Sequence, residues 1–141
     1  MPGASRSVVI NAPIEKVFDV ITAYERYPQF LTECKEVKLS GREGNEVNVH
    51  YKIDVVKTIR YTLHMKEERP RKLTWTFVEG EIMKDNHGNW ALEAAGEGKT
   101  KATYTIEMRL GPLVPKSIVN SLVDASLPKM LEAFRKQAES R

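Results

Sequence analysis

The spacing of apolar residues changes twice along the chain, and these changes limit the folds that the chain can adopt. Over residues 14–21, apolar side chains recur at the i, i+3, i+4, i+7 spacing of a buried helix face. From about residue 33 to residue 110 they alternate with polar ones, as in strands with one wet and one dry side. From residue 116 the helical spacing returns. The pattern predicts short helices, then a run of strands, then a C-terminal helix.

The N-terminal part of the chain favours a short strand followed by two helical segments. Ser7–Ile10 has the character of a strand. A helix follows, and Pro13 suits its first position, where the missing N–H costs nothing. Tyr24–Leu31 is typical of a second, shorter helix or turn, which Pro28 is expected to interrupt.

The alternating region divides into one-sided strands separated by turn residues. Short connections between successive strands of this kind are typical of an antiparallel sheet. The apolar positions are Val47, Val49, Tyr51 and Ile53; Ile59, Tyr61, Leu63 and Met65; Leu73, Trp75 and Phe77; Trp90, Leu92 and Ala94; and Tyr104, Ile106, Met108 and Leu110. The breaks between them are Gly41–Asn45, Arg69–Arg71, Asp85–Asn86 and Gly96–Gly98.

A wide apolar stripe over residues 116–139 predicts a long C-terminal helix. Pro128 lies in the middle of this segment and is expected to kink the helix. The sheet offers one apolar face and the helix one apolar stripe, so the two must bury each other. Because a sheet of this size twists and curls, its dry face becomes concave. We expect an α+β fold in which a curved antiparallel sheet of about six to seven strands wraps around the long C-terminal helix.

Composition favours one domain over residues 1–141 and excludes several classes of protein. The 22 basic and 19 acidic residues are interspersed and leave a net charge of +3, without the one-signed patch that nucleic-acid binding needs. The single cysteine, Cys34, cannot form an intramolecular disulfide and is more typical of a small buried side chain than of a nucleophile. No apolar run reaches the roughly 18 residues of a transmembrane helix. We expect a cytoplasmic protein, without a transmembrane segment and free to contact a membrane transiently.

The sequence contains no recognisable catalytic or metal-binding motif. Gly98–Thr100 resembles the end of a phosphate-binding loop, but Glu93 stands where the first glycine would be. No two of the histidines, His50, His64 and His87, have the spacing of a zinc site. Two of them fall on polar strand faces and His87 in a turn, so all three are expected to be solvated. We predict no catalytic residue, no metal and no cofactor.

The dry face of the predicted sheet is rich in aromatic and methionine side chains. A core that needs only filling favours leucine, isoleucine and valine. Tyrosine and tryptophan carry a polar tip that needs a partner, and methionine adapts to irregular space. Such walls are typical of a ligand pocket, and they are equally compatible with a plain core. The residues are Tyr51, Tyr61, Tyr104, Trp75, Trp90, Met65 and Met108, with Met130 and Phe134 on the helix stripe.

Segments spread over nearly the whole chain carry a resemblance to a known family. They are Val9–Val20 (VINAPIEKVFDV), Tyr24–Leu31 (YERYPQFL) followed by Cys34, Trp75–Gly80, Gly88–Leu92 and Leu113–Pro115. Together they are similar to the polyketide cyclase/dehydrase and lipid-transport family of the START-like (SRPBCC) superfamily, which includes the coenzyme Q-binding proteins and the ribosome-association toxin. The resemblance implies a helix-grip fold of the START/Bet v 1 type, with two short helices after the first strand and a cavity between sheet and C-terminal helix.

This resemblance favours the pocket over the plain core. It leads us to expect binding or transport of a small hydrophobic ligand that is lipid-, quinone- or polyketide-like. One alternative is an aromatase/cyclase or dehydratase that acts on a polyketide-like substrate without a metal, and another is an interaction module of the ribosome-association toxin type. We expect a binder more than an enzyme, and ligand identity and oligomeric state stay open. The expected ligand-binding residues are Tyr51, Tyr61, Leu63, Trp75, Phe77, Trp90, Tyr104, Met108, Val123, Leu127 and Met130.

Overall fold

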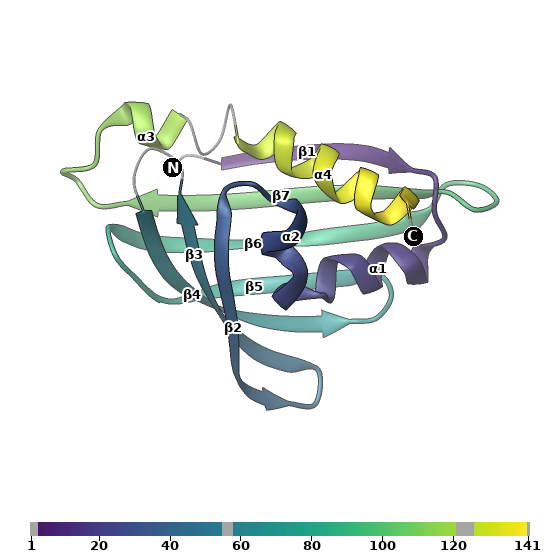
Figure 1. Ribbon diagram of the computed structural model, residues 1–141, viewed down its shortest axis with the longest axis horizontal. Coiled ribbons are helices and arrows are strands. Elements are labelled where there is room, and N and C mark those ends of the chain that lie inside the picture. The colour runs from purple at the N-terminus through teal and green to yellow at the C-terminus, as the bar shows by residue number, and fades with distance from the viewer. Residues whose placement is uncertain (1–2, 55–57, 121–125, 141) are drawn as a thin grey trace.

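The computed structural model describes residues 3–54, 58–120 and 126–140, which form seven strands and a small set of helices (Figure 1). The strands are β1 (Gly3–Ile10), β2 (Cys34–Glu43), β3 (Glu46–Asp54), β4 (Thr58–Glu68), β5 (Lys72–Gly80), β6 (Met83–Ala94) and β7 (Thr100–Leu110). The helices are α1 (Ile14–Thr22), the 3-10 turn η1 (Tyr24–Arg26), α2 (Tyr27–Phe30), α3 (Lys116–Asn120) and α4 (Leu127–Ser140).

All seven strands form one antiparallel sheet, in the order β1-β7-β6-β5-β4-β3-β2. Strands β2 to β7 pair with their neighbours in sequence, and β1 pairs with β7 at one edge. The sheet curves, and α1, α2 and α4 lie on its concave side (Figure 1). This arrangement confirms the expected helix-grip fold, because the dry face of the sheet and the apolar faces of the helices bury each other.

The two N-terminal helices form where the sequence predicts them. Helix α1 buries Val17, Phe18, Val20 and Ile21 and so presents one apolar face to the sheet. Pro13 lies one position earlier than expected, as the residue that caps the helix. After it come η1 and α2. The expected break at Pro28 is wrong, because Tyr27 has helical backbone angles and Pro28 is the second residue of α2, where its missing N–H costs nothing.

The C-terminal segment, residues 116–139, is predicted to form a single kinked helix. Its described residues form α3 and α4, and residues 121–125 lie outside the described part. Pro128 is the second residue of α4 and lies two residues after Ser126, which is already in a π-helical turn. No helix among the described residues is long and apolar enough to cross a membrane.

Strand β6 is longer than its sequence pattern suggests. Asp85 and Asn86, expected in a turn, lie inside it, and so does His87. The connection from β5 is Glu81–Ile82 instead, and the register shifts between Met83 and Asp85 as in a β-bulge. Because a bulge adds a residue to one strand, it breaks the alternation from which strands are predicted.

Gly88 of β6 sits opposite Trp75 of β5 and leaves room for its indole ring. A Cβ at Gly88 would collide with the carbonyl oxygen of Thr105 and lie 2.9 Å from Cζ2 of Trp75. The close approach of β7 and of the indole therefore depends on glycine at this position.

We expect Gly88→Ala to lower the free energy of unfolding by at least about 3 kcal/mol, because the new methyl group meets backbone that cannot move aside. The matched control is Gly111→Ala, whose Cβ would meet its nearest atom at an ordinary 3.5 Å. That change should stay within about 0.5 kcal/mol of the parent. Thermal and denaturant unfolding of both variants measures the difference, and equal stability of the two would contradict the packing described.

Candidate functional site

A cavity of about 310 Å³ lies between the concave face of the sheet and helices α2 and α4. Protein interiors contain few voids larger than a water molecule, so a space of this size in a small fold is a candidate binding site. Nine of the eleven residues expected to bind a ligand line it: Tyr51, Tyr61, Leu63, Trp75, Trp90, Tyr104, Met108, Leu127 and Met130.

The other two expected residues do not belong to the described lining. Phe77 is half-buried near the end of β5, where its ring lies close to Gly80 and Tyr61, and it takes no part in the cavity wall. The register between β4 and β5 shifts beside it, between Thr62 and Leu63, so the alternation that suggested Phe77 ends there. Val123 falls outside the described residues.

Sixteen lining residues are not among the expected ligand-binding residues. Five of them lie on the apolar faces that the sequence predicted, namely Ile53, Met65, Leu73, Ile106 and Phe134, and the other eleven fall into three groups. Tyr27 and Phe30–Cys34 come from α2, the irregular link after it and the first residue of β2, a stretch without a hydrophobic period. Met83 and Asn86 come from the bulged start of β6. Ser126, Lys129 and Ala133 come from α4 and the residue before it. Only the first group left a usable signal, because two aromatic side chains in so short a helix indicate that it covers something apolar.

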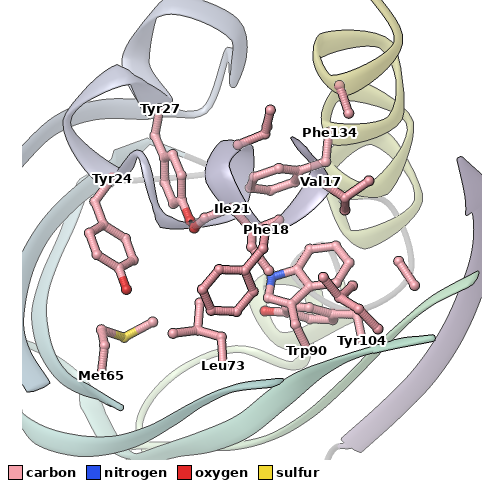
Figure 2. Close-up of a cluster of buried hydrophobic side chains, with 14 of the residues drawn as sticks. Val17, Phe18, Ile21, Tyr24, Tyr27, Met65, Leu73, Trp90, Tyr104 and Phe134 are labelled. Atoms are coloured by element: carbon pink, nitrogen blue, oxygen red, sulfur yellow. Dashed lines mark hydrogen bonds between the residues drawn. The ribbon is translucent and has the colours of Figure 1, made fainter. Parts of the chain in front are cut away.

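Aromatic rings build a continuous wall around part of the cavity. The ring of Phe134 on α4 lies 5.3 Å, centroid to centroid, from the rings of Tyr27, Phe30 and Trp90. Trp90 in turn lies 4.9 Å from Tyr104 in an edge-to-face arrangement. Figure 2 shows four of these rings, those of Tyr27 on α2, Phe134 on α4, and Trp90 and Tyr104 on the sheet. Edge-to-face pairs at such distances stabilise one another beyond their burial, so this wall is preformed.

The tyrosine hydroxyls fall into two groups. Tyr24 donates to Glu67, which two nitrogens of Arg42 also contact, and Tyr27 donates to the backbone carbonyl of Ile21. These two hydroxyls are used by the fold itself. None of the hydrogen bonds between described residues involves the hydroxyls of the cavity residues Tyr51, Tyr61 and Tyr104, which makes them candidate polar contacts for a ligand.

Charge is confined to one part of the lining. Its only charged members in the described chain are Glu33, which accepts a hydrogen bond from Ser126 at 3.0 Å, and Lys129. Lys129 is exposed, and so is Thr32, the lining residue that precedes Glu33 in the sequence. The cavity therefore reaches the surface between the α2–β2 link and the first turn of α4. The wall formed by the sheet is neutral. It includes the Cys34 thiol, whose pKa burial raises to about 11, so that it is protonated and unreactive near neutral pH.

The histidines lie outside the cavity lining. His50 contacts Ser40 and Thr62, while His87 lies in β6 between Asp85 and Glu107 instead of in a turn. Within the described ranges, no group of three or more His, Cys, Asp or Glu side chains is arranged to hold a metal ion. Apart from Glu33 and Lys129, the described lining offers neutral hydrogen-bonding groups and apolar surface.

Comparison with known proteins relates the whole chain to a family. The family described as polyketide cyclase/dehydrase and lipid transport matches residues 1–139. An uncharacterized protein of Pseudomonas aeruginosa is 30% identical over 129 residues, which are 80% of this chain and 63% of that protein. The chain thus spans less than two thirds of that relative. The ribosome association toxin RatA of the same organism is 26% identical over 95% of this chain and 93% of its own.

Solved structures show the same fold at low sequence identity. An aromatase/cyclase, Zhui from Streptomyces sp. R1128, has a TM-score of 0.85 and 16% identity, covering 99% of this chain and 94% of its own. A START superfamily protein from Mycobacterium smegmatis has a TM-score of 0.85 and 15% identity, covering 98% of this chain and 97% of its own. At these identities the likeness concerns the fold.

The tyrosines should make the protein sensitive to alkali. Burial raises the pKa of all five, Tyr24, Tyr27, Tyr51, Tyr61 and Tyr104, above the ordinary value of 10.0. Above that pH the unfolded chain loses phenolic protons that the folded chain retains. The unfolded state then binds fewer protons, so the free energy of unfolding falls as the pH rises.

We therefore expect phenolate absorbance to appear only together with unfolding, at a pH above 10.0, and not as a gradual titration of the native protein. Parallel measurements of ultraviolet absorbance and circular dichroism against pH check this. Ionisation of several tyrosines near their ordinary pKa with the fold intact would show that the cavity is well hydrated.

Proposed function

Because the chain belongs to the polyketide cyclase/dehydrase and lipid transport family, we propose that it binds a small hydrophobic molecule in the cavity between sheet and α4. The observation that carries this proposal is a preformed void of about 310 Å³, walled by aromatic and methionine side chains. Its size lies at the lower end of the range of small-molecule sites. The ligand class is a lipid-, quinone- or polyketide-like molecule.

The energy for binding comes from the apolar wall. Wall atoms that face a void lack packing partners on one side, and a ligand supplies them. A molecule that buries about 200 Å² of apolar surface gains on the order of 5 kcal/mol from removal of that surface from water. Because the rings around Phe134 already contact one another, little side-chain ordering opposes this gain.

The described lining supports a binder more than an enzyme. Its tyrosines and Cys34 are neutral at physiological pH, and the Glu33 carboxylate is bonded to Ser126 at the surface end of the cavity. An acid and a base held within reach of one buried ligand atom are therefore lacking in the described lining. An aromatase/cyclase or dehydratase activity would have to use the hydroxyls of Tyr51, Tyr61 and Tyr104 together with water.

The similarity to the ribosome association toxin over 95% of the chain supports a second candidate function, contact with a ribosomal partner. The two functions differ in what each needs from the cavity. A hydrophobic-ligand protein loses its function when the cavity is filled, whereas a surface interaction is unaffected. Co-sedimentation with ribosomes, compared between the parent and a cavity-filled variant, separates the two.

Filling the cavity should remove ligand binding at little cost in stability. Leu127 and Leu131 are both buried on α4, but only Leu127 lines the cavity. We expect Leu127→Trp to abolish binding of the apolar fluorescent probe Nile red and to change the free energy of unfolding by less than about 1 kcal/mol. Leu131→Trp is the matched control, which should cost about 1–3 kcal/mol by overpacking and leave probe binding intact.

Fluorescence titration and thermal unfolding of the parent and both variants measure these effects. Mass spectrometry of the native protein, followed by extraction, identifies any ligand retained during purification. If Leu127→Trp is as destabilising as Leu131→Trp and still binds the probe, the region is closed core and the proposed site is wrong.

A further inference from the structure

Asn86 is a buried polar side chain that faces the cavity. Three polar residues are buried among those described: Thr62, Asn86 and Thr100. Thr62 contacts His50, outside the cavity, and Thr100 donates to the carbonyl of Ala12. Asn86, which is only 4% exposed, is the one that lines the cavity.

Trp75 determines the orientation of the Asn86 amide. The indole Nε1–H donates to Oδ1 of Asn86 at 3.0 Å. An indole nitrogen can only donate a hydrogen bond, so the amide must turn its oxygen towards Trp75 and its NH₂ group away. The usual ambiguity between the oxygen and nitrogen of an asparagine side chain is thereby removed.

The position of Trp75 is in turn set by the backbone. Trp75 pairs with Gly88, two residues from Asn86 on the same strand, and its ring occupies the space that a Cβ at Gly88 would take. The ring also lies 5.3 Å from that of Tyr104. The indole therefore packs against Gly88 of β6 and Tyr104 of β7, and these contacts fix the direction of the Asn86 amide.

The NH₂ group of Asn86 has one weak partner among the described residues, the sulfur of Met83 at 3.7 Å. A thioether is a poor acceptor, and an amide nitrogen carries two donors. The group can therefore donate a hydrogen bond to an acceptor on a ligand. The charged lining residues, Glu33 and Lys129, belong to the α2–β2 link and to α4, so the sheet around Asn86 supplies no counter-ion. An anionic acceptor buried there would lose its hydration without compensation.

We propose that the Asn86 amide, oriented by Trp75, donates a hydrogen bond to a neutral carbonyl oxygen of the ligand and makes the cavity selective for carbonyl-bearing hydrophobic molecules. Carboxylates and plain hydrocarbons of the same shape bind less tightly. This inference rests on the proposed function and adds the residue that determines specificity. Asn86 touches the ligand, and Trp75 is a positioning residue that acts through it.

Three rigid probes of matched shape test the proposal on the full chain: 9-fluorenone, fluorene and fluorene-9-carboxylate. Each competes with Nile red in a fluorescence titration. The parent protein should bind fluorenone about tenfold more tightly than fluorene, which is the difference expected from one neutral hydrogen bond. It should bind the carboxylate more weakly than either. Equal affinity for fluorenone and fluorene would overturn the proposal and leave the proposed function standing, whereas no binding of any probe would overturn both.

Variants assign the selectivity to the residue. Asn86→Leu should remove the preference for fluorenone and leave fluorene affinity unchanged. Asn89→Leu is the matched control, because Asn89 is also an asparagine of β6 but lies outside the cavity lining. This variant should keep the preference for fluorenone. Trp75→Phe leaves the amide in place without its orienting donor and should reduce the preference. If Asn86→Leu does not fold, the Trp75→Phe variant still tests whether the oriented amide produces the preference for fluorenone.

The carbonyl stretching band of bound fluorenone supplies a readout that a purely structural role would not move. Donation from Asn86 should shift the band to lower wavenumber in the parent and in Asn89→Leu, and the shift should disappear in Asn86→Leu. A shift that persists in Asn86→Leu would mean that another group, such as a tyrosine hydroxyl, holds the carbonyl, and it would overturn the assignment to Asn86.

Discussion

The apolar concave face of one long, curved sheet is the constraint on which the rest of this structure depends. Strand β6, with 12 residues, is about 40 Å long, whereas the 14 residues of α4 span only about 21 Å. One helix of this length cannot cover such a face. Helix α1 covers a further part with Phe18 and Ile21, which are buried but do not line the cavity (Figure 2). The cavity is the part of the concave face, beside the first turns of α4, that neither α1 nor α4 covers.

This constraint gives the same residue type two roles. Tyr24 and Tyr27, close to α1, donate their hydroxyls to Glu67 and to a backbone carbonyl, although the ring of Tyr27 also lines the cavity. The hydroxyls of three other tyrosines that line the cavity make no hydrogen bond to a described residue. They are Tyr51, Tyr61 and Tyr104. Burial keeps the phenols of both groups neutral, since it raises their pKa values. What differs is whether the fold or a bound molecule uses the hydroxyl.

The spacing of apolar residues in the sequence predicted the regular strands and helices correctly. The alternating strands placed residues such as Tyr61, Trp75 and Tyr104 on the dry face, and all three line the cavity. The prediction failed where regularity ends: at Phe77, beside a register shift, and in the irregular link after α2. A period identifies faces, but it carries no information about bulges, links or helix ends.

The bulge at the start of β6 shows why the missed residues matter. Alternation along β6 puts Asn86 on the same face as Gly88 and Trp90. The sequence analysis instead expected a turn there, because Asp85 and Asn86 are typical turn residues. The bulge lets Met83 and Asn86 face the interior together, close enough for the amide to touch the sulfur. Bulges re-aim side chains next to functional sites, and departures from local regularity concentrate at such sites. Asn86 satisfies the buried indole N–H of Trp75, and its amide adds an NH₂ group whose one partner among the described residues is the weakly accepting sulfur of Met83.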